Sequence, residues 1–211
     1  MTLPDDLLPI AQQVGLARVG RVAAALDQRV GGVVCVMEAV RRRHNASAIL
    51  RSCEAFGVHE VQLVTAGFRS SKGAARGSER WVDLRQQPTT GAALDDLEGR
   101  GFRIYVADLS KDAWTPETLP VDQPLALLFG SEVRGVSSEA RAHGTVCVPM
   151  HGLTESLNVS VSAAILLHAV AERRRALVGP DLPAERKAAF LRAWLEAEAA
   201  ALRGWMARTA E

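Results

Sequence analysis

The sequence predicts an α/β protein with a mostly parallel β-sheet and helices on both faces of that sheet. Segments with apolar residues at three- and four-residue spacing, which is typical of helices, alternate along the chain with short apolar runs. The runs are rich in Val, Leu and Ile and lie at 33–37, 58–64, 103–107, 125–129 and 145–148. Strands that are apolar throughout and alternate with helices are typical of a parallel sheet that is covered on both faces.

The first third of the chain predicts two helices that each precede a strand. Apolar residues repeat at helical spacing over 7–28, ahead of the strand at 33–37. Asn45 is a favourable N-cap for the second helix, and Gly57 closes that helix before the strand at 58–64. This order predicts parallel strands, because a helix between two strands returns the chain to the same edge of the sheet.

The remaining elements continue the alternation. Gly, Ser and Arg dominate 65–80, which predicts a loop, and short helices are expected over 91–100 and 137–142. A long helix over 159–178 carries three arginines near its C-terminal end, where cations interact favourably with the helix dipole. A further helix over 184–206 has a strongly apolar side, which needs a partner surface in its own core or in another subunit.

Length and composition fit one soluble domain with helical extensions. The 211 residues are 48% hydrophobic and 23% charged, which is ordinary for a globular protein with a sizeable core. We expect an N-terminal helical extension over 1–30, a main domain over 31–178 and a helical tail over 179–211.

Arginine is unevenly distributed, although the formal net charge is only +1. Residues 18–51 contain seven arginines against two acidic residues, and a second basic cluster spans 69–85. Local basic clusters bind phosphate even in a chain of nearly neutral charge. Exposed, solvated arginines produce the same pattern, so composition by itself leaves both interpretations open.

Cysteine and apolar patterns exclude several classes of protein. Cys35, Cys53 and Cys147 are too widely spaced for a metal motif, and isolated cysteines in odd number are typical of free thiols in a reducing compartment. The first nine residues lack the basic stretch and apolar core of a secretory signal. No apolar run reaches the roughly 20 residues that span a bilayer. We therefore expect a cytoplasmic protein without a metal and without a membrane segment.

Polar residues and a glycine follow two of the predicted strands at what becomes the carboxyl edge of the sheet. Ser156 and Asn158 lie in the loop after the last strand, and Gly130 and Glu132 follow the strand at 125–129. Ligands of open α/β folds bind in the crevice beyond such strand ends. Ser and Asn are also common helix caps, and a glycine after a strand is also a common turn, so both roles stay open here.

Arg51 is predicted in the middle of a helix, away from the apolar side of that helix. An exposed guanidinium there is either solvated, or it clamps a phosphate and helps to remove the proton of a ribose 2′-hydroxyl. Arg is normally always protonated, so a role as base needs help from the substrate phosphate or a strong local field. Asn45 either orients Arg51 or only caps the helix.

Taken together, three motifs resemble those of the SpoU/TrmH family of RNA 2′-O-ribose methyltransferases, in the family's order and at its approximate spacing. The resemblance implies a SPOUT fold whose C-terminal part forms a deep trefoil knot. Within the family, the chain is most similar to members that methylate guanosine 18 of tRNA. The motifs are Asn45 to Arg51, Phe129-Gly130-Ser131-Glu132 with Gly135-Val136-Ser137, and Val148-Pro149-Met150 with Glu155-Ser156-Leu157-Asn158-Val159-Ser160.

The resemblance implies S-adenosyl-L-methionine as the cofactor and S-adenosyl-L-homocysteine as the product. Arg51 is implied to activate the 2′-oxygen and Asn45 to position it, while Glu132, Ser156 and Asn158 complete the catalytic pocket. Methyl transfer is an in-line displacement, so the protein must align and deprotonate the nucleophile. The implied cofactor-binding residues are Ala107, Asp108, Leu109, Gly130, Val148, Met150 and Leu157.

The resemblance also implies tRNA as a partner and a homodimer in which the Arg51 of one subunit completes the site of the other. The chain departs from the family at Arg41-Arg42-Arg43-His44, where relatives often have a Lys-Pro pair, and at His151 and Glu155. The alternatives are methylation of rRNA or of another tRNA position, and a non-catalytic RNA-binding protein of the same fold. The residues expected to contact RNA are Arg18, Arg21, Arg41, Arg42, Arg43, His44, Arg69, Lys72 and Arg76.

Overall fold

The chain folds into two compact units, and the structure, a computed structural model, describes residues 3–64, 77–131 and 134–209. The larger unit spans Val30–Asp181. The smaller unit combines the chain up to Arg29 with the chain from Leu182 onwards. The two terminal segments therefore share one unit, and the division of the chain into three functional segments stays a prediction.

The larger unit is built on a six-stranded sheet with the order β3-β2-β1-β5-β4-β6, in which every neighbouring pair is parallel. Strand β1 pairs with β2 on one side and with β5 on the other. The chain therefore places β2 and β3 on one side of β1 and the later strands on the other side, so the direction in which strands are added reverses at β1. Ligands of open sheets bind beyond the carboxyl ends of strands at such a reversal. The strands are β1 (Val30–Glu38), β2 (Val58–Val64), β3 (Asp83–Gln86), β4 (Arg103–Ala107), β5 (Leu125–Phe129) and β6 (Gly144–Val146).

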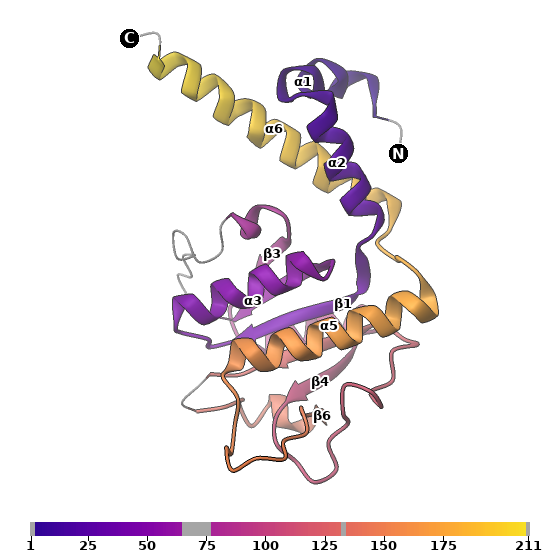
Figure 1. Ribbon diagram of the computed structural model, residues 1–211, viewed down its shortest axis with the longest axis vertical. Helices are drawn as coiled ribbons and strands as arrows, with labels where there is room; N and C mark the ends of the chain where they lie inside the picture. Colours follow the sequence, from indigo (N-terminus) through magenta and orange to yellow (C-terminus); the bar gives the residue numbers. More distant parts are fainter. Residues whose placement is uncertain (1–2, 65–76, 132–133, 210–211) are drawn as a thin grey trace. The chain divides into compact units, whose positions relative to one another are not determined.

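Helices cover both faces of the sheet, and Figure 1 shows α3 and α5 side by side over one of them. On one face, α3 (Arg43–Ala55) and α5 (Val159–Val178) pack against each other and against the buried side chains of the central strands. On the other face, α4 (Thr90–Gly99) contributes Leu94 and Leu97 to a second apolar cluster. The predicted α/β class with a parallel sheet is confirmed, whereas the trefoil knot stays a prediction.

The smaller unit contains the helices α1 (Leu8–Val14), α2 (Leu16–Asp27) and α6 (Ala184–Thr209). The single helix predicted over 7–28 is wrong. Gly15 has a φ of +101°, a conformation that glycine adopts readily, and it separates α1 from α2. Helix α6 contacts both α1 and α2, so the apolar side of this helix finds its partner surface within the same unit.

Three further predictions differ from the structure. Strand β3 was not predicted, because its four residues are mostly polar and it lies at the edge of the sheet. The helix predicted over 137–142 is reduced to a 3₁₀ turn at Ala140–Ala142. Asn45 lies inside α3 with its side chain buried, so the prediction that it caps this helix is wrong.

A buried guanidinium explains the glycine at position 32, near the start of β1. Arg174 of α5 is 4% exposed, pairs with Asp181 at 2.6 Å and donates a hydrogen bond to the carbonyl of Val121 at 2.8 Å. Asp181 also accepts hydrogen bonds from the backbone N–H groups of Gly31 and Gly32. A Cβ at Gly32 would lie 2.3 Å from the Nη2 of Arg174, so any side chain at this position displaces the guanidinium.

Within the described residues, no helix combines the length and the apolar character that crossing a membrane requires. Cys35 and Cys53 are buried free thiols, and Cys147 is partly buried. Burial raises the pKa of the Cys35 thiol well above its usual range, and the hydrogen bond with Cys53 adds to this effect. The Cys35 thiol therefore stays protonated and serves the core as a small apolar side chain.

Candidate functional site

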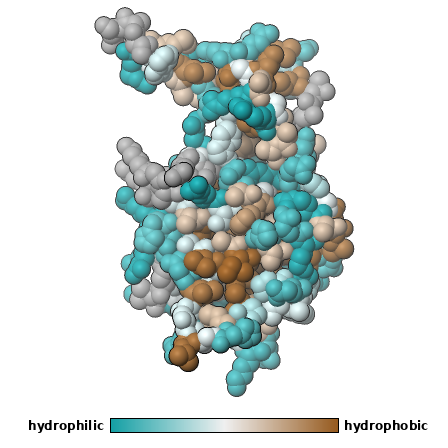
Figure 2. All heavy atoms as spheres, viewed as in Figure 1, coloured by the Kyte–Doolittle hydropathy of each residue, from teal (hydrophilic) through white to brown (hydrophobic). Residues whose placement is uncertain are grey.

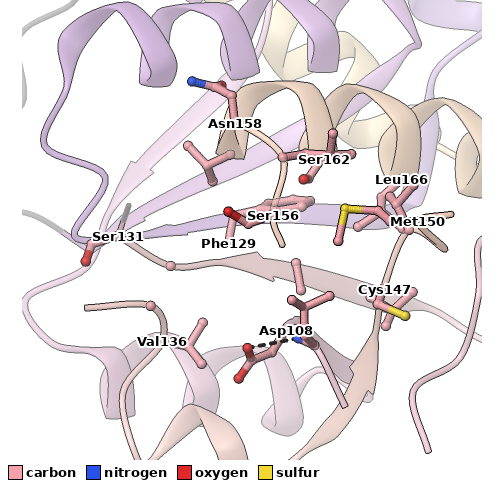
Figure 3. A pocket seen from close by; sticks show the side chains of 18 of the residues that line it. Asp108, Phe129, Ser131, Val136, Cys147, Met150, Ser156, Asn158, Ser162 and Leu166 are labelled. Atoms are coloured by element: carbon pink, nitrogen blue, oxygen red, sulfur yellow. Dashed lines mark hydrogen bonds between the residues drawn. The ribbon is translucent and has the colours of Figure 1, made fainter. Parts of the chain in front are cut away.

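A pocket of about 460 Å³ lies at the carboxyl edge of the sheet. Its walls come from the segments after β4, β5 and β6, from the loop that leads into α5 and from the first turns of α5. Apolar side chains such as Phe129 and Leu166 line the pocket together with the hydroxyl groups of Ser131, Ser156 and Ser162 (Figure 3). A mostly apolar pocket with a few polar groups is typical of a small-molecule site.

The pocket brings together every residue that the family resemblance implies as cofactor-binding. These residues come from three segments that are far apart in the sequence and become neighbours because β4 lies between β5 and β6 in the sheet. Their role in binding stays a prediction, but all of them line the same pocket. They are Ala107, Asp108, Leu109, Gly130, Val148, Met150 and Leu157.

Asn158 links the pocket to α3. Its side-chain oxygen accepts hydrogen bonds from the backbone N–H of Ser160 at 2.8 Å and from the hydroxyl of Ser160 at 2.7 Å, so Asn158 caps α5. Its amide nitrogen donates to the Oδ1 of Asn45 at 3.2 Å, and Asn45 is only 1% exposed. Asn158 is therefore a helix cap, and its remaining amide group also joins the first sequence motif to the third.

Gly130 permits a tight loop after β5. Ser131 and Gly135 exchange backbone hydrogen bonds at 3.0 and 2.9 Å, which folds the loop back on itself. A Cβ at Gly130 would lie 2.5 Å from the carbonyl of Gly135 and 2.6 Å from the backbone nitrogen of Val136. Only glycine fits this close approach of two backbones. Glu132, which was predicted to complete the catalytic pocket, lies outside the described residues.

Among the described residues, Arg42 and Asp108 are the charged residues that line the pocket. Asp108 pairs with Arg141 at 2.9 Å and lies across the pocket from Asn158 (Figure 3). Arg42 immediately precedes α3, and its carbonyl accepts a hydrogen bond from the backbone N–H of Asn45 at 3.0 Å. The charge of Asp108 is therefore compensated within the chain, while Arg42 brings a positive charge to the side of the pocket next to α3.

Arg51 is the predicted site residue that the structure leaves apart. It is exposed on α3 and does not line the pocket. Asn45 lies six residues earlier on the same helix, which is about 240° around the helix axis, so the two side chains leave α3 in different directions. The structure thus places Ser156 and Asn158 on the wall of the pocket and joins Asn158 to Asn45 by a hydrogen bond, whereas Arg51 stays outside the pocket of its own chain.

The residues predicted to contact RNA differ in their surroundings. The run from Arg41 to His44 is exposed at the start of α3. Arg18 pairs with Glu198 at 2.8 Å and stacks on Trp194, with the guanidinium carbon 5.4 Å from the ring centroid, while Arg21 is exposed. Arg69, Lys72 and Arg76 lie outside the described residues, as does most of the loop predicted over 65–80.

Several residues of the pocket were not predicted as ligand-binding residues. Ser162 and Leu166 follow Asn158 at four-residue spacing and therefore lie on the same side of α5, which was a signal in the sequence. The other unpredicted lining residues are Phe129, Ser131, Gly135, Val136, Val146, Cys147 and Val159.

The described residues include no group of three or more His, Cys, Asp or Glu side chains that could bind a metal ion.

Comparison with known sequences gives a consistent result. Residues 32–168 match the model of the SpoU rRNA Methylase family. The chain is 39% identical over 187 residues to the tRNA (guanosine(18)-2'-O)-methyltransferase of Thermus thermophilus, covering 85% of this chain and 96% of the relative. It is 37% identical to the tRNA (guanosine(18)-2'-O)-methyltransferase of Escherichia coli K12, covering 75% of this chain and 71% of the relative.

Comparison with solved structures agrees with the sequence comparison. The TrmH/SpoU tRNA modifying enzyme of A. aeolicus aligns with a TM-score of 0.79 at 29% identity, over 87% of this chain and 97% of that chain. The SpoU methyltransferase AviRb of Streptomyces viridochromogenes, in complex with the cofactor AdoMet, aligns with a TM-score of 0.59 at 25% identity. That alignment covers 70% of this chain and 58% of AviRb.

Proposed function

Because this chain belongs to the SpoU rRNA Methylase family, we propose that it transfers a methyl group from S-adenosyl-L-methionine to the ribose 2′-oxygen of guanosine 18 in tRNA. The observation that carries the proposal is that the second and third motifs line one pocket, while a hydrogen bond joins Asn158 of the third motif to Asn45 of the first. The choice of tRNA and of guanosine 18 follows the relatives named above. The protein then works in the cytoplasm, where its substrate is found.

The pocket suits this cofactor in size and in chemistry. Its volume of about 460 Å³ falls within the roughly 300–1,000 Å³ of small-molecule sites. Apolar side chains such as Val136, Leu157 and Leu166 suit an adenine ring, and the segments after β4, β5 and β6 offer backbone N–H and C=O groups to its polar edge. When bound, the cofactor supplies an electrophilic methyl group on a sulfonium centre.

The chain's own residues then align the nucleophile and dispose of its proton. The amide group of Asn158, which the buried Asn45 holds in place, orients the ribose hydroxyl, which is the alignment that an in-line displacement needs. The 2′-oxygen forms a bond to the methyl carbon as the carbon–sulfur bond breaks, which leaves S-adenosyl-L-homocysteine. The hydroxyl proton passes to a substrate phosphate held by the Arg51 guanidinium, because a protonated guanidinium cannot accept it.

Arg51 acts in this proposal on the pocket of a second copy of the chain. The exposure of Arg51 and its separation from the pocket of its own chain support this arrangement. An apolar surface lies on α5, the helix that packs against α3. On this helix Val161 is 45% exposed and Ile165 is 39% exposed, and Leu157 at the pocket is 36% exposed. Figure 2 shows apolar surface gathered over the first half of α5. A homodimer that covers this surface removes it from water.

Positive charge without an intramolecular partner supports an RNA substrate. In the described part of the chain, the side chains of Arg41, Arg42, Arg43 and Arg51 make no hydrogen bond or ion pair, whereas most arginines elsewhere in the larger unit are paired or donate to carbonyls. These four arginines lie on or immediately before α3. Guanidinium groups that are free of carboxylates are available for phosphates, and such contacts make RNA binding strongly dependent on salt.

The reaction and its target are tested by transfer of a labelled methyl group from S-adenosyl-L-methionine to unmodified tRNA, followed by mapping of the modified nucleotide. Label on the ribose of guanosine 18 is expected. Label on another tRNA ribose, or transfer to rRNA alone, would keep the reaction and overturn the target. Binding of tRNA without transfer to any RNA would favour the non-catalytic alternative.

The role of Arg51 is tested with two variants that are each inactive for a different reason. We expect Arg51→Ala to lower turnover by about 100-fold or more while cofactor binding stays nearly intact, and Asn158→Ala to damage the pocket itself. Mixed dimers of the two variants contain one complete site if Arg51 acts on the partner, and they contain none if it acts within its own chain. Recovery of activity on mixing is therefore expected, and its absence would contradict the dimeric site.

A further inference from the structure

Glu38 is a buried carboxylate at the carboxyl edge of the sheet that the proposed chemistry does not use. It is the last residue of β1, 6% exposed, and it does not line the pocket. No cation among the described residues pairs with its carboxylate. A buried polar group without a charged partner depends on hydrogen bonds, so the identity of the donors shows what Glu38 holds in place.

Two donors from different elements converge on Glu38. Its Oε1 accepts a hydrogen bond from the hydroxyl of Thr90 at 2.5 Å, and its Oε2 accepts one from the backbone N–H of Ser137 at 2.9 Å. The backbone of Glu38 is fixed as well, because it pairs with Val64 of β2. The next residue, Ala39, turns the chain with a φ of +52°. Glu38 is thus a fixed point to which the first turn of α4 and the segment at Ser137 are attached.

The hydrogen bond from the backbone N–H of Ser137 to Glu38 fixes the position of the end of one pocket wall. The wall consists of Ser131, Gly135 and Val136, which line the pocket, and Ser137 is the next residue along the chain. At its start the wall is held by β5 and by the backbone pair between Ser131 and Gly135. Beyond the wall, the Ser137 hydroxyl accepts a hydrogen bond from the N–H of Ala140 at 3.2 Å. The Glu38 carboxylate supplies the link from the end of this wall to the central strand of the sheet.

We infer that Glu38 is a positioning residue for the cofactor pocket, which holds the wall formed by Ser131, Gly135 and Val136 at the distance that the bound cofactor needs. This inference rests on the proposed use of S-adenosyl-L-methionine. Glu38 touches neither the cofactor nor the RNA in this arrangement. Its loss therefore weakens the binding of the cofactor through the wall, while RNA binding and the chemical step at saturating cofactor remain close to those of the intact protein.

The test compares variants of Glu38 with Thr90→Val, which removes the other hydrogen bond of the same carboxylate and leaves Ser137 attached. Affinity for S-adenosyl-L-methionine and S-adenosyl-L-homocysteine is measured by calorimetry, together with the melting temperature and the KM and kcat of methyl transfer. We expect Glu38→Ala to weaken cofactor binding by about tenfold or more. We expect Glu38→Gln, which keeps an acceptor for the Ser137 N–H, and Thr90→Val to stay within about threefold.

Glu38→Asp keeps the charge but shortens the side chain, so it gives a second measurement that does not depend on the folding of the alanine variant. It is expected to raise the KM for the cofactor with little change in kcat. Equal cofactor affinity in the wild type and in Glu38→Ala, or an equal loss in Thr90→Val, would show that Glu38 serves folding only. If the wild type itself fails to bind either cofactor form, the proposed function is wrong, and this result is distinguishable from a failure of the Glu38 inference.

Discussion

The buried carboxylate of Glu60 on β2 stabilises the folded chain by an amount that follows directly from its contacts. Its carboxylate is 1% exposed and accepts two hydrogen bonds from Arg100, at 2.7 and 2.8 Å, and one from Gln62 at 3.0 Å. Burial by itself raises the pKa of Glu60. The hydrogen bonds from Arg100 and Gln62 and the charges of Arg100 and Arg85 outweigh this effect and lower the pKa from 4.5 to about 2.

Replacement of Glu60 by Gln removes the charge and keeps the shape. Each pKa unit corresponds to about 1.4 kcal/mol, so a fall from 4.5 to about 2 means that the ionised carboxylate stabilises the folded state by about 3 kcal/mol. Gln keeps one carbonyl acceptor for Arg100 but leaves that guanidinium without its buried anion. We expect the free energy of unfolding at pH 7 to fall by about 2–3 kcal/mol.

The pH dependence follows from the lowered pKa of Glu60. Between pH 4.5 and about 2 the unfolded chain protonates this carboxyl while the folded chain keeps it ionised, so the unfolded state binds more protons. The stabilisation is therefore complete above pH 4.5 and disappears as the pH falls towards 2. The difference in unfolding free energy between wild type and Glu60→Gln should shrink over the same range.

Urea unfolding followed by tryptophan fluorescence at pH 7, 5 and 3.5, at one protein concentration, measures this difference. Glu98→Gln is the matched control, because the Glu98 side chain on α4 is 55% exposed and its Oε1 lies 3.7 Å from the Nδ1 of His143. A difference below about 1 kcal/mol at pH 7, the size that an exposed ion pair gives, would refute the reasoning. A difference that does not change with pH would refute it as well.

Three more substitutions test the site and the larger unit. Gly130→Ala should abolish cofactor binding, because its Cβ would lie 2.5 Å from backbone atoms, whereas Gly152→Ala meets no atom within 4 Å and should bind normally in the same calorimetric titration. Asp181→Ala leaves the Arg174 guanidinium buried without its anion and should lower the unfolding free energy by about 3 kcal/mol or more in urea; a loss below about 1 kcal/mol would contradict the buried pair. Thr89→Ala removes the N-cap of α4 and should cost about 1 kcal/mol, and no change in the melting temperature would show that the cap is dispensable.

The periodicity of apolar residues was sufficient to predict most of the larger unit, because the burial that selects those residues is a local property of each segment. It predicted α5 with the bounds that the structure has, Val159–Val178. It failed where tertiary contacts override local preference. Strand β3 exists because it pairs with β2, although its residues are mostly polar. Asn45 could serve as a cap by its local preference, yet its hydrogen bond to Asn158 places it inside α3.

The same distinction applies to the site. Residues that follow buried strands are recognisable in the sequence, and for this reason the expected cofactor residues all line the pocket. The sequence could not show that the Asp108 charge is compensated by Arg141, or that Arg51 is exposed and does not line the pocket of its own chain. These facts depend on which strands become neighbours and on how each helix rotates against the sheet.

The class of fold, the order of most elements and the three motifs that mark the family could be predicted without coordinates, because each of them depends on short runs of residues. The meeting of Glu38, Thr90 and Ser137, which ties α4 and a wall of the pocket to one carboxylate, is seen only in the folded chain. Residues 38 and 137 are 99 positions apart. A contact over that distance follows from the packing of the whole sheet and from no local pattern.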